Sequence, residues 1–262
     1  MTYLDALILG IVEGITEFLP VSSTGHMILV SSLLQIGEDS FTKSFEIIIQ
    51  LGAILAVVFV YRKKIFSNFA LMYKVFLAFL PTAVIGLALY SVVKRYLLGN
   101  VYVVIASLFF GGIIIWLFEK KNMKGMVAQV DTDLVESSVT VKQALYIGLF
   151  QSIAIVPGVS RSAATIIGGQ MLGLSRKVIV EFSFLLAIPV MLAATALDVY
   201  KHHDSFVGNQ LEMLSIGFIT AFFVALLAIK TFLAYIQKHS FAAFGVYRIV
   251  LAIVFLGVLY FV

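Results

Sequence analysis

Residues 10–30 read GIVEGITEFLPVSSTGHMILV, an apolar stretch that carries two glutamates, a proline, a cluster of hydroxyl side chains and a histidine. An uninterrupted apolar stretch of this length would predict one membrane-spanning helix, which needs ~20 residues. Pro20 and the polar residues after it interrupt the pattern. Non-helical backbone at membrane depth is tolerated only where protein or water surrounds it. The stretch therefore predicts a re-entrant or broken helix in a membrane protein.

The composition of the whole chain agrees with this prediction. The 262 residues are 61% hydrophobic and 12% charged, with a mean hydropathy of +1.08, whereas soluble domains are roughly 45–50% apolar. We expect an all-α, polytopic integral membrane protein in which residues 1–262 form one membrane domain. The expected crossings are residues 45–61, 69–93, 101–118, 179–200, 211–233 and 244–262. The net charge of +4 is explained by basic loops, so no nucleic-acid partner is expected.

A second broken stretch, residues 141–174, matches the first when the chain is shifted by 138 residues. The shift places Glu13 on Gln151 and Ser22 on Ser160, and the same features recur in the same order along the chain. It predicts two repeats joined by a polar linker. Their boundaries are residues 1–125 with the motif at 13–26, the linker at 126–137, and residues 138–262 with the motif at 157–165.

The basic residues predict how these repeats lie in the membrane. If each broken stretch enters and leaves on one side, each repeat has three crossings and the second repeat is inverted. Cytoplasmic loops carry an excess of Lys and Arg. One side then holds Arg62, Lys63, Lys64, Lys74, Lys120, Lys121, Lys124, Lys142, Arg176, Lys177 and Lys238, and the other holds Lys43, Lys94, Arg95 and Lys201. We therefore expect the first side to be cytoplasmic and the broken stretches to meet near the midplane.

Two acidic residues lie four positions apart in the first motif. On a helix Glu13 and Glu17 share one face. An acidic residue at the centre of a membrane helix costs ~2.5–3.5 kcal/mol, and two like charges together cost more. The plain alternative is a pair of protonated or solvated carboxylates near the interface. The apolar surroundings favour a functional pair that binds a metal cation or transfers protons.

Hydroxyl groups and a histidine follow Pro20 in Ser22, Ser23, Thr24 and His26. Each alone is most simply a helix cap or a packing residue. Together, one turn beyond two acids, they favour chemistry, because a hydroxyl nucleophile needs a neighbouring base and His is the usual one. Ser23 and His26 can converge if the segment after Pro20 is helical.

The second motif, PGVSRSAAT at residues 157–165, has the features of an anion site. Gly158 lets the backbone approach a ligand, and Ser160, Ser162 and Thr165 place hydroxyls at a helix start, where free N–H groups attract anions. Arg161 adds a guanidinium suited to phosphate, although it could also serve as a structural partner for an acid. The motif predicts a phosphate-binding site at membrane depth.

Other polar residues in apolar segments give weaker signals. Glu46 and Gln50 could line the same cavity. Arg248, inside the last crossing, is expected to snorkel to the cytoplasmic face or to pair with a neighbour.

The segments EGITEFLPVSSTGH and PGVSRSAAT resemble the two signature motifs of bacterial undecaprenyl-pyrophosphate phosphatases of the bacitracin-resistance type, and the resemblance covers essentially the whole chain. It implies hydrolysis of undecaprenyl diphosphate to the monophosphate carrier of peptidoglycan synthesis, in the bacterial cytoplasmic membrane, with a site open to the extracytoplasmic side. It also implies a divalent cation, Mg²⁺ or Ca²⁺.

The resemblance assigns roles by motif position. Glu13 and Glu17 would be the acidic, metal-binding pair, Ser23 the nucleophile and His26 the acid or base. Arg161 would act in catalysis and phosphate binding. The other phosphate-binding candidates are Ser22, Thr24, Gly158, Ser160, Ser162 and Thr165.

Several alternatives stay open at this stage. Water could attack the phosphoryl group directly, with Ser23 only orienting it. The repeats and broken helices are also the architecture of secondary transporters, so a carrier for the polyprenyl phosphate is the alternative function. Membrane lipids and the polyprenyl diphosphate are the expected partners, and a homodimer is possible.

Overall fold

The computed structural model describes residues 1–37, 39–97, 100–122, 139–202 and 209–261, and these residues form helices and connecting loops without a strand. Six helices are long and apolar enough to cross a membrane. They are α3 (Ser40–Ser67), α4 (Phe69–Val92), α5 (Val101–Asn122), α9 (Arg176–His202), α10 (Gln210–Ile236) and α11 (Ala242–Phe261). The prediction of an all-α, polytopic membrane protein is confirmed.

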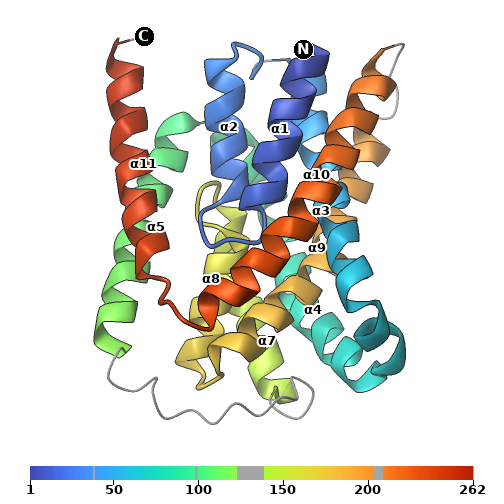
Figure 1. The fold of residues 1–262 in the computed structure, drawn as a ribbon, viewed down its shortest axis with the longest axis vertical. Coiled ribbons are helices and arrows are strands. Elements are labelled where there is room, and N and C mark those ends of the chain that lie inside the picture. Colours follow the sequence, from blue (N-terminus) through green and yellow to red (C-terminus); the bar gives the residue numbers. More distant parts are fainter. Residues whose placement is uncertain (38, 98–99, 123–138, 203–208, 262) are drawn as a thin grey trace.

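The two broken stretches form hairpins of short helices. The first contains α1 (Tyr3–Thr16) and α2 (Ser23–Leu33); the second contains α7 (Val141–Ser152), a 3₁₀ turn (Ile153–Ile155) and α8 (Arg161–Met171). None of these helices exceeds 14 residues, so each is shorter than the ~20 residues that a crossing needs. The first hairpin lies at the end of the molecule that holds both termini, and the second lies toward the opposite end (Figure 1).

Local capping explains where these helices begin. Thr2 and Asp5 form a capping box at the start of α1, and Thr140 and Gln143 form another at the start of α7. Ser22 and Ser160 cap α2 and α8, with positive φ angles of 72° and 80°. Each pair of caps is separated by the 138-residue shift, which supports the two-repeat hypothesis. That hypothesis stays a prediction, and its proposed linker, with Lys124 before it, lies outside the described residues.

Each hairpin packs against a long helix from the other half of the chain. Helix α1 contacts α10, and α7 contacts α4. Glycines permit both contacts: a Cβ on Gly10 would lie 2.7 Å from the carbonyl oxygen of Gly217, and a Cβ on Gly148 would lie 2.1 Å from that of Ala78. Close approach of backbones at small residues is the usual way that helices pack in membranes. The packing therefore fixes both hairpins in the bundle.

An aromatic cluster supports the loop between α1 and α2. Phe18 is fully buried, and its ring meets that of Phe184 edge to face at 5.1 Å. Tyr61 and Phe232 pack around Phe184 as well. Such a pair contributes about 0.5–1.5 kcal/mol beyond burial of its surface. Because Phe18 follows Glu17 directly, this packing also limits the movement of the Glu17 carboxylate.

Candidate active site

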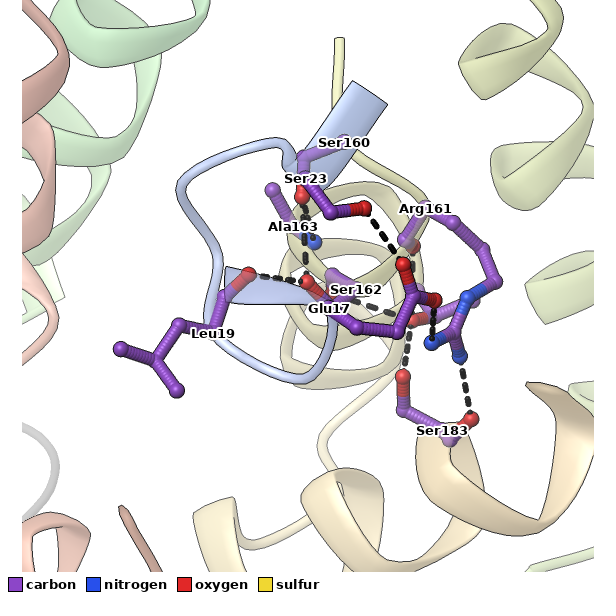
Figure 2. A network of polar contacts seen from close by, with 9 residues as sticks. Glu17, Leu19, Ser23, Ser160, Arg161, Ser162, Ala163 and Ser183 are labelled. Carbon is purple, nitrogen blue, oxygen red and sulfur yellow. Dashed lines mark hydrogen bonds and ion pairs between the residues drawn. The ribbon is translucent and has the colours of Figure 1, made fainter. Parts of the chain in front are cut away.

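An ion pair joins the two broken stretches. Arg161, the first residue of α8, donates a 2.9 Å hydrogen bond from Nη2 to Oε1 of Glu17, which caps the end of α1 (Figure 2). Both side chains are buried, with 9% and 2% of their surfaces exposed. Arg161 also donates from Nη1 to the carbonyl oxygen of Ser183 on α9, at 2.7 Å. The guanidinium is thus fixed from two sides, which limits the directions in which it can meet an anion.

Ser23 lies on the other side of the same carboxylate. Its Oγ donates a short hydrogen bond to Oε2 of Glu17 (Figure 2). The left-handed backbone at Ser22 turns the chain sharply between α1 and α2 and aims Ser23 back at the end of α1. Glu17 therefore contacts both a hydroxyl and a guanidinium, an arrangement in which the carboxylate can accept the Ser23 proton.

The hydroxyls of the second motif serve mainly to shape it. Oγ of Ser162 donates to the carbonyl oxygen of Leu19 at 2.7 Å, and so links the two loops. Oγ1 of Thr165 bonds to Oγ of Ser183 at 2.6 Å and to the carbonyl oxygen of Arg161 at 3.0 Å. Oγ of Ser160 accepts from the N–H of Ala163 at 3.2 Å. Ser162 and Thr165 thus position the segment that carries Arg161.

A cavity of about 250 Å³ adjoins this network. Its polar lining residues are Glu17, Ser22, Ser23, Thr24, Thr82, Gln151, Gly158, Ser160 and Arg161, and its apolar lining residues are Ala154, Ile155, Pro157, Val190 and Met191. Seven of the predicted site residues are therefore brought together here. Glu13, His26, Ser162 and Thr165 do not line the cavity, and neither do Glu46 and Gln50. A cavity lined by both charged and apolar side chains suits an amphipathic ligand.

Glu13 is fully buried, and within the described residues neither carboxylate oxygen has a hydrogen-bond partner. A buried carboxylate without a partner is costly unless it binds a proton or a cation. Among the described residues, no three His, Cys, Asp or Glu side chains cluster as a metal site. Glu13 and Glu17 are therefore the residues that could share a proton or hold a cation, and a cation would need further ligands besides these two carboxylates.

His26 has partners other than Ser23. Its Nδ1 lies 2.8 Å from the carbonyl oxygen of Ser22, and its Nε2 lies 2.7 Å from the hydroxyl of Tyr247 on α11. The His26 and Tyr247 rings stack with centroids 5.6 Å apart. The segment after Pro20 is helical as required, yet Ser23 meets Glu17. The acid or base role of His26 stays a prediction.

Several residues of the site and its support were not predicted from the sequence. Thr82 and Gln151 line the cavity and bond to each other at 2.8 Å. Ser183 holds Arg161. A signal existed for Gln151, because the 138-residue shift places it on Glu13. Arg248 does not snorkel: it is fully buried and bonds to backbone carbonyls.

These features define a class of protein: a polytopic membrane protein with an acid, a hydroxyl and an arginine at a cavity inside its helix bundle. The chain belongs to the family described as bacitracin resistance protein BacA, whose family model matches residues 6–254. It is 50% identical to the undecaprenyl-diphosphatase of Sulfurihydrogenibium sp. (strain YO3AOP1), over 97% of this chain and 98% of the relative. A Campylobacter jejuni protein of that name (serotype O:6) is 51% identical over 99% and 96%. The one from Aquifex aeolicus is 48% identical over 97% and 98%.

Proposed function

We propose that this chain is an undecaprenyl-diphosphatase, which hydrolyses undecaprenyl diphosphate to undecaprenyl phosphate and inorganic phosphate. The reaction returns the lipid carrier to peptidoglycan synthesis and confers resistance to bacitracin. The observation that carries the proposal is the contact of Glu17 with both Ser23 and Arg161 at the cavity. Similarity to relatives of this name along nearly the whole chain supports it.

The cavity matches the two parts of such a substrate. The diphosphate would lie against Arg161 and the other polar lining residues at the start of α8, where the helix dipole favours negative charge. The first isoprene units would lie against Ile155, Val190 and Met191. Nε of Arg161 is buried and has no hydrogen-bond partner among the described residues, so the guanidinium keeps one unsatisfied donor beside the cavity.

The contacts favour a two-step phosphoryl transfer. Oγ of Ser23 attacks the terminal phosphorus and passes its proton to Glu17, while the bond to the bridging oxygen breaks and undecaprenyl phosphate leaves. Water then hydrolyses the phosphoserine and releases inorganic phosphate. Arg161 stabilises the charge on the equatorial oxygens, because this reaction depends mostly on positioning and charge neutralisation. Direct attack by water on the same phosphorus, with Ser23 orienting it, uses the same residues.

We also propose that Glu13 and Glu17 hold a divalent cation, Mg²⁺ or Ca²⁺. When bound, it would neutralise charge on the diphosphate. The unpartnered oxygens of Glu13 support this proposal.

For the location, we propose the bacterial cytoplasmic membrane, with the site open to the extracytoplasmic side. The basic residues support the orientation. Lys64 and Arg176 belong to the larger of the two groups of basic residues that the sequence places on opposite sides. They form ion pairs with Glu181 and Glu119, respectively. They lie at the end of α3 and the start of α9, and these helix ends are far from the chain termini (Figure 1). This end of the molecule would be cytoplasmic.

The arrangement of the hairpins favours a second candidate function. Two hairpins that enter from opposite ends are typical of transporters with alternating access, so the chain could carry the monophosphate lipid across the membrane. Phosphate release, unlike transport, can be measured without a second compartment across a membrane. Purified protein in detergent should therefore convert undecaprenyl diphosphate to the monophosphate, with one inorganic phosphate per lipid. No release in the presence of Mg²⁺ or Ca²⁺ would leave the transporter as the better account.

A further inference from the structure

Arg248 is a buried cation in the second turn of α11. Its side chain is fully buried, and no described carboxylate forms an ion pair with it. Its guanidinium donates only to main-chain carbonyl oxygens: those of Gly158 and Val159 at 2.9 Å, Ser107 at 3.0 Å, Pro20 at 3.3 Å and Leu108 at 3.4 Å. A buried charge is costly unless its hydrogen bonds are satisfied, so this position has a specific role.

The carbonyls that Arg248 binds belong to both breaks of the site. Pro20 is in the loop between α1 and α2, and Gly158 and Val159 precede α8. These loops end at Ser22 and Ser160, the two residues with left-handed or positive-φ backbone that cap α2 and α8. One guanidinium therefore fixes the spacing of the two loops that lead into Ser23 and Arg161.

Binding of these carbonyls also orients the peptide N–H groups. The described peptide bonds are all trans, so the N–H in a peptide unit points opposite to its carbonyl. The carbonyl of Val159 points to Arg248, and the N–H of Ser160 therefore points away from it. Ser160 and Gly158 line the cavity. The positive charge of Arg248 lies within hydrogen-bond distance of the Gly158 carbonyl, and no described acid forms an ion pair with it.

We propose that Arg248 is a positioning residue, which holds the Val159–Ser160 peptide and the Pro20 loop in the geometry that binds the diphosphate and adds positive potential behind it. The proposal rests on the proposed function for its ligand. Arg248 itself acts through the backbone, since its five hydrogen bonds all go to carbonyl oxygens. Its role is thus distinct from that of Arg161, which lines the cavity.

Two kinds of variant test this role. Arg248→Met removes the donors and the charge, and Arg248→Lys keeps the charge but loses the planar set of donors. Gly111→Ala leaves Arg248 in place but adds a Cβ 2.3 Å from its Nη2, so the guanidinium must shift. Gly257→Ala on α11 is the matched control, because nothing lies within 4 Å of its Cβ.

The readouts are the dissociation constant for inorganic diphosphate, from its effect on thermal unfolding in detergent, and kcat and KM for undecaprenyl diphosphate. Arg248→Met should weaken diphosphate binding on the order of tenfold, as expected for loss of hydrogen bonds to a charged group. KM should rise by a similar factor and more than kcat falls. The dissociation constants and KM values of Arg248→Lys and Gly111→Ala should lie between those of Arg248→Met and wild type. Those of Gly257→Ala should match wild type.

A folded Arg248→Met protein with unchanged diphosphate affinity and KM would overturn the proposal. If that variant does not fold, equal affinities for Gly111→Ala and Gly257→Ala would overturn it instead. The binding readout separates this proposal from the proposed function. If diphosphate binding depends on Arg248 but the wild type releases no phosphate, the hydrolase is refuted and the positioning role stays intact.

Discussion

The guanidinium of Arg161 and the carboxylate of Glu17 form a buried ion pair across 144 residues of sequence, with a 2.9 Å hydrogen bond. This pair makes each broken stretch depend on the other, because the first supplies the acid and the hydroxyl and the second supplies the cation. Removal of one partner from a buried pair destabilises a protein by roughly 3–5 kcal/mol. The pair therefore serves the stability of the loops and the chemistry of the cavity together.

Replacement of Arg161 by lysine should separate charge from geometry. Lysine keeps the positive charge, but it lacks the planar fork that bonds to Glu17 and to the carbonyl of Ser183 at once. We expect KM for undecaprenyl diphosphate to rise about tenfold or more, since hydrogen bonds to charged groups contribute about 1.5–3 kcal/mol each. Steady-state phosphate release measures this. A Lys variant with wild-type KM would show that only charge is needed.

Replacement of Ser23 and of Ser162 by alanine should have different effects, although each residue lies in one of the two signature motifs. Ser23→Ala removes the hydroxyl that contacts Glu17 in the cavity, and kcat should fall by on the order of 10³ or more if it is the nucleophile. Ser162→Ala removes the bond to the carbonyl of Leu19 and should cost about 1 kcal/mol of stability with a smaller loss of turnover. Phosphate release and thermal unfolding distinguish them. Near-normal turnover in Ser23→Ala would favour direct attack by water.

Removal of divalent cations should stop turnover, because Glu13 and Glu17 are proposed to hold one. Chelation should abolish phosphate release, and titration with Mg²⁺ or Ca²⁺ should restore it. Glu13→Gln should shift the cation concentration for half-maximal activity upward by on the order of tenfold, as loss of one carboxylate ligand weakens binding. The same cation dependence in Glu13→Gln and wild type would remove Glu13 from the metal site and leave it as a proton carrier.

The contact between α7 and α4 should tolerate no side chain at Gly148. A Cβ there would lie 2.1 Å from the carbonyl oxygen of Ala78, so Gly148→Ala must push the helices apart. Such overpacking costs about 1–3 kcal/mol, which thermal unfolding in detergent would detect. Gly86→Ala on α4 is the matched control, since its nearest neighbour is a side-chain carbon of Ile155 at 3.9 Å. Equal stability of the two variants would contradict the described packing.

Much of this arrangement could be predicted from the sequence. Hydropathy located the six long helices, and Pro20 and Pro157 marked the two breaks. Residue chemistry then selected Glu17, Ser23 and Arg161, which the structure brings together. Glu17 and Arg161 stand out in the sequence because an ionisable side chain is costly at membrane depth and is therefore rare there.

Directions of side chains could not be predicted in the same way. The three-residue spacing of Ser23 and His26 places both on one face of a helix. The packing of α11 nevertheless brings Tyr247, and not Ser23, to the His26 ring. The sequence alone predicts that Arg248 snorkels. Its five backbone acceptors come from three segments that are distant in sequence, so they become apparent only in the structure. Such contacts depend on how the helices pack, and a single sequence does not encode that locally.

The rate of phosphate release by Glu17→Gln tests the central claim most directly. Glutamine keeps the size of Glu17 but cannot accept the Ser23 proton or balance Arg161. Glu181→Gln is the control, because Glu181 also forms an ion pair, 2.5 Å from Lys64, but lies outside the cavity. With purified proteins that remain folded, turnover of undecaprenyl diphosphate should fall on the order of 10³ or more in Glu17→Gln and stay near wild type in Glu181→Gln. Comparable turnover in Glu17→Gln and wild type would contradict the assignment of this site.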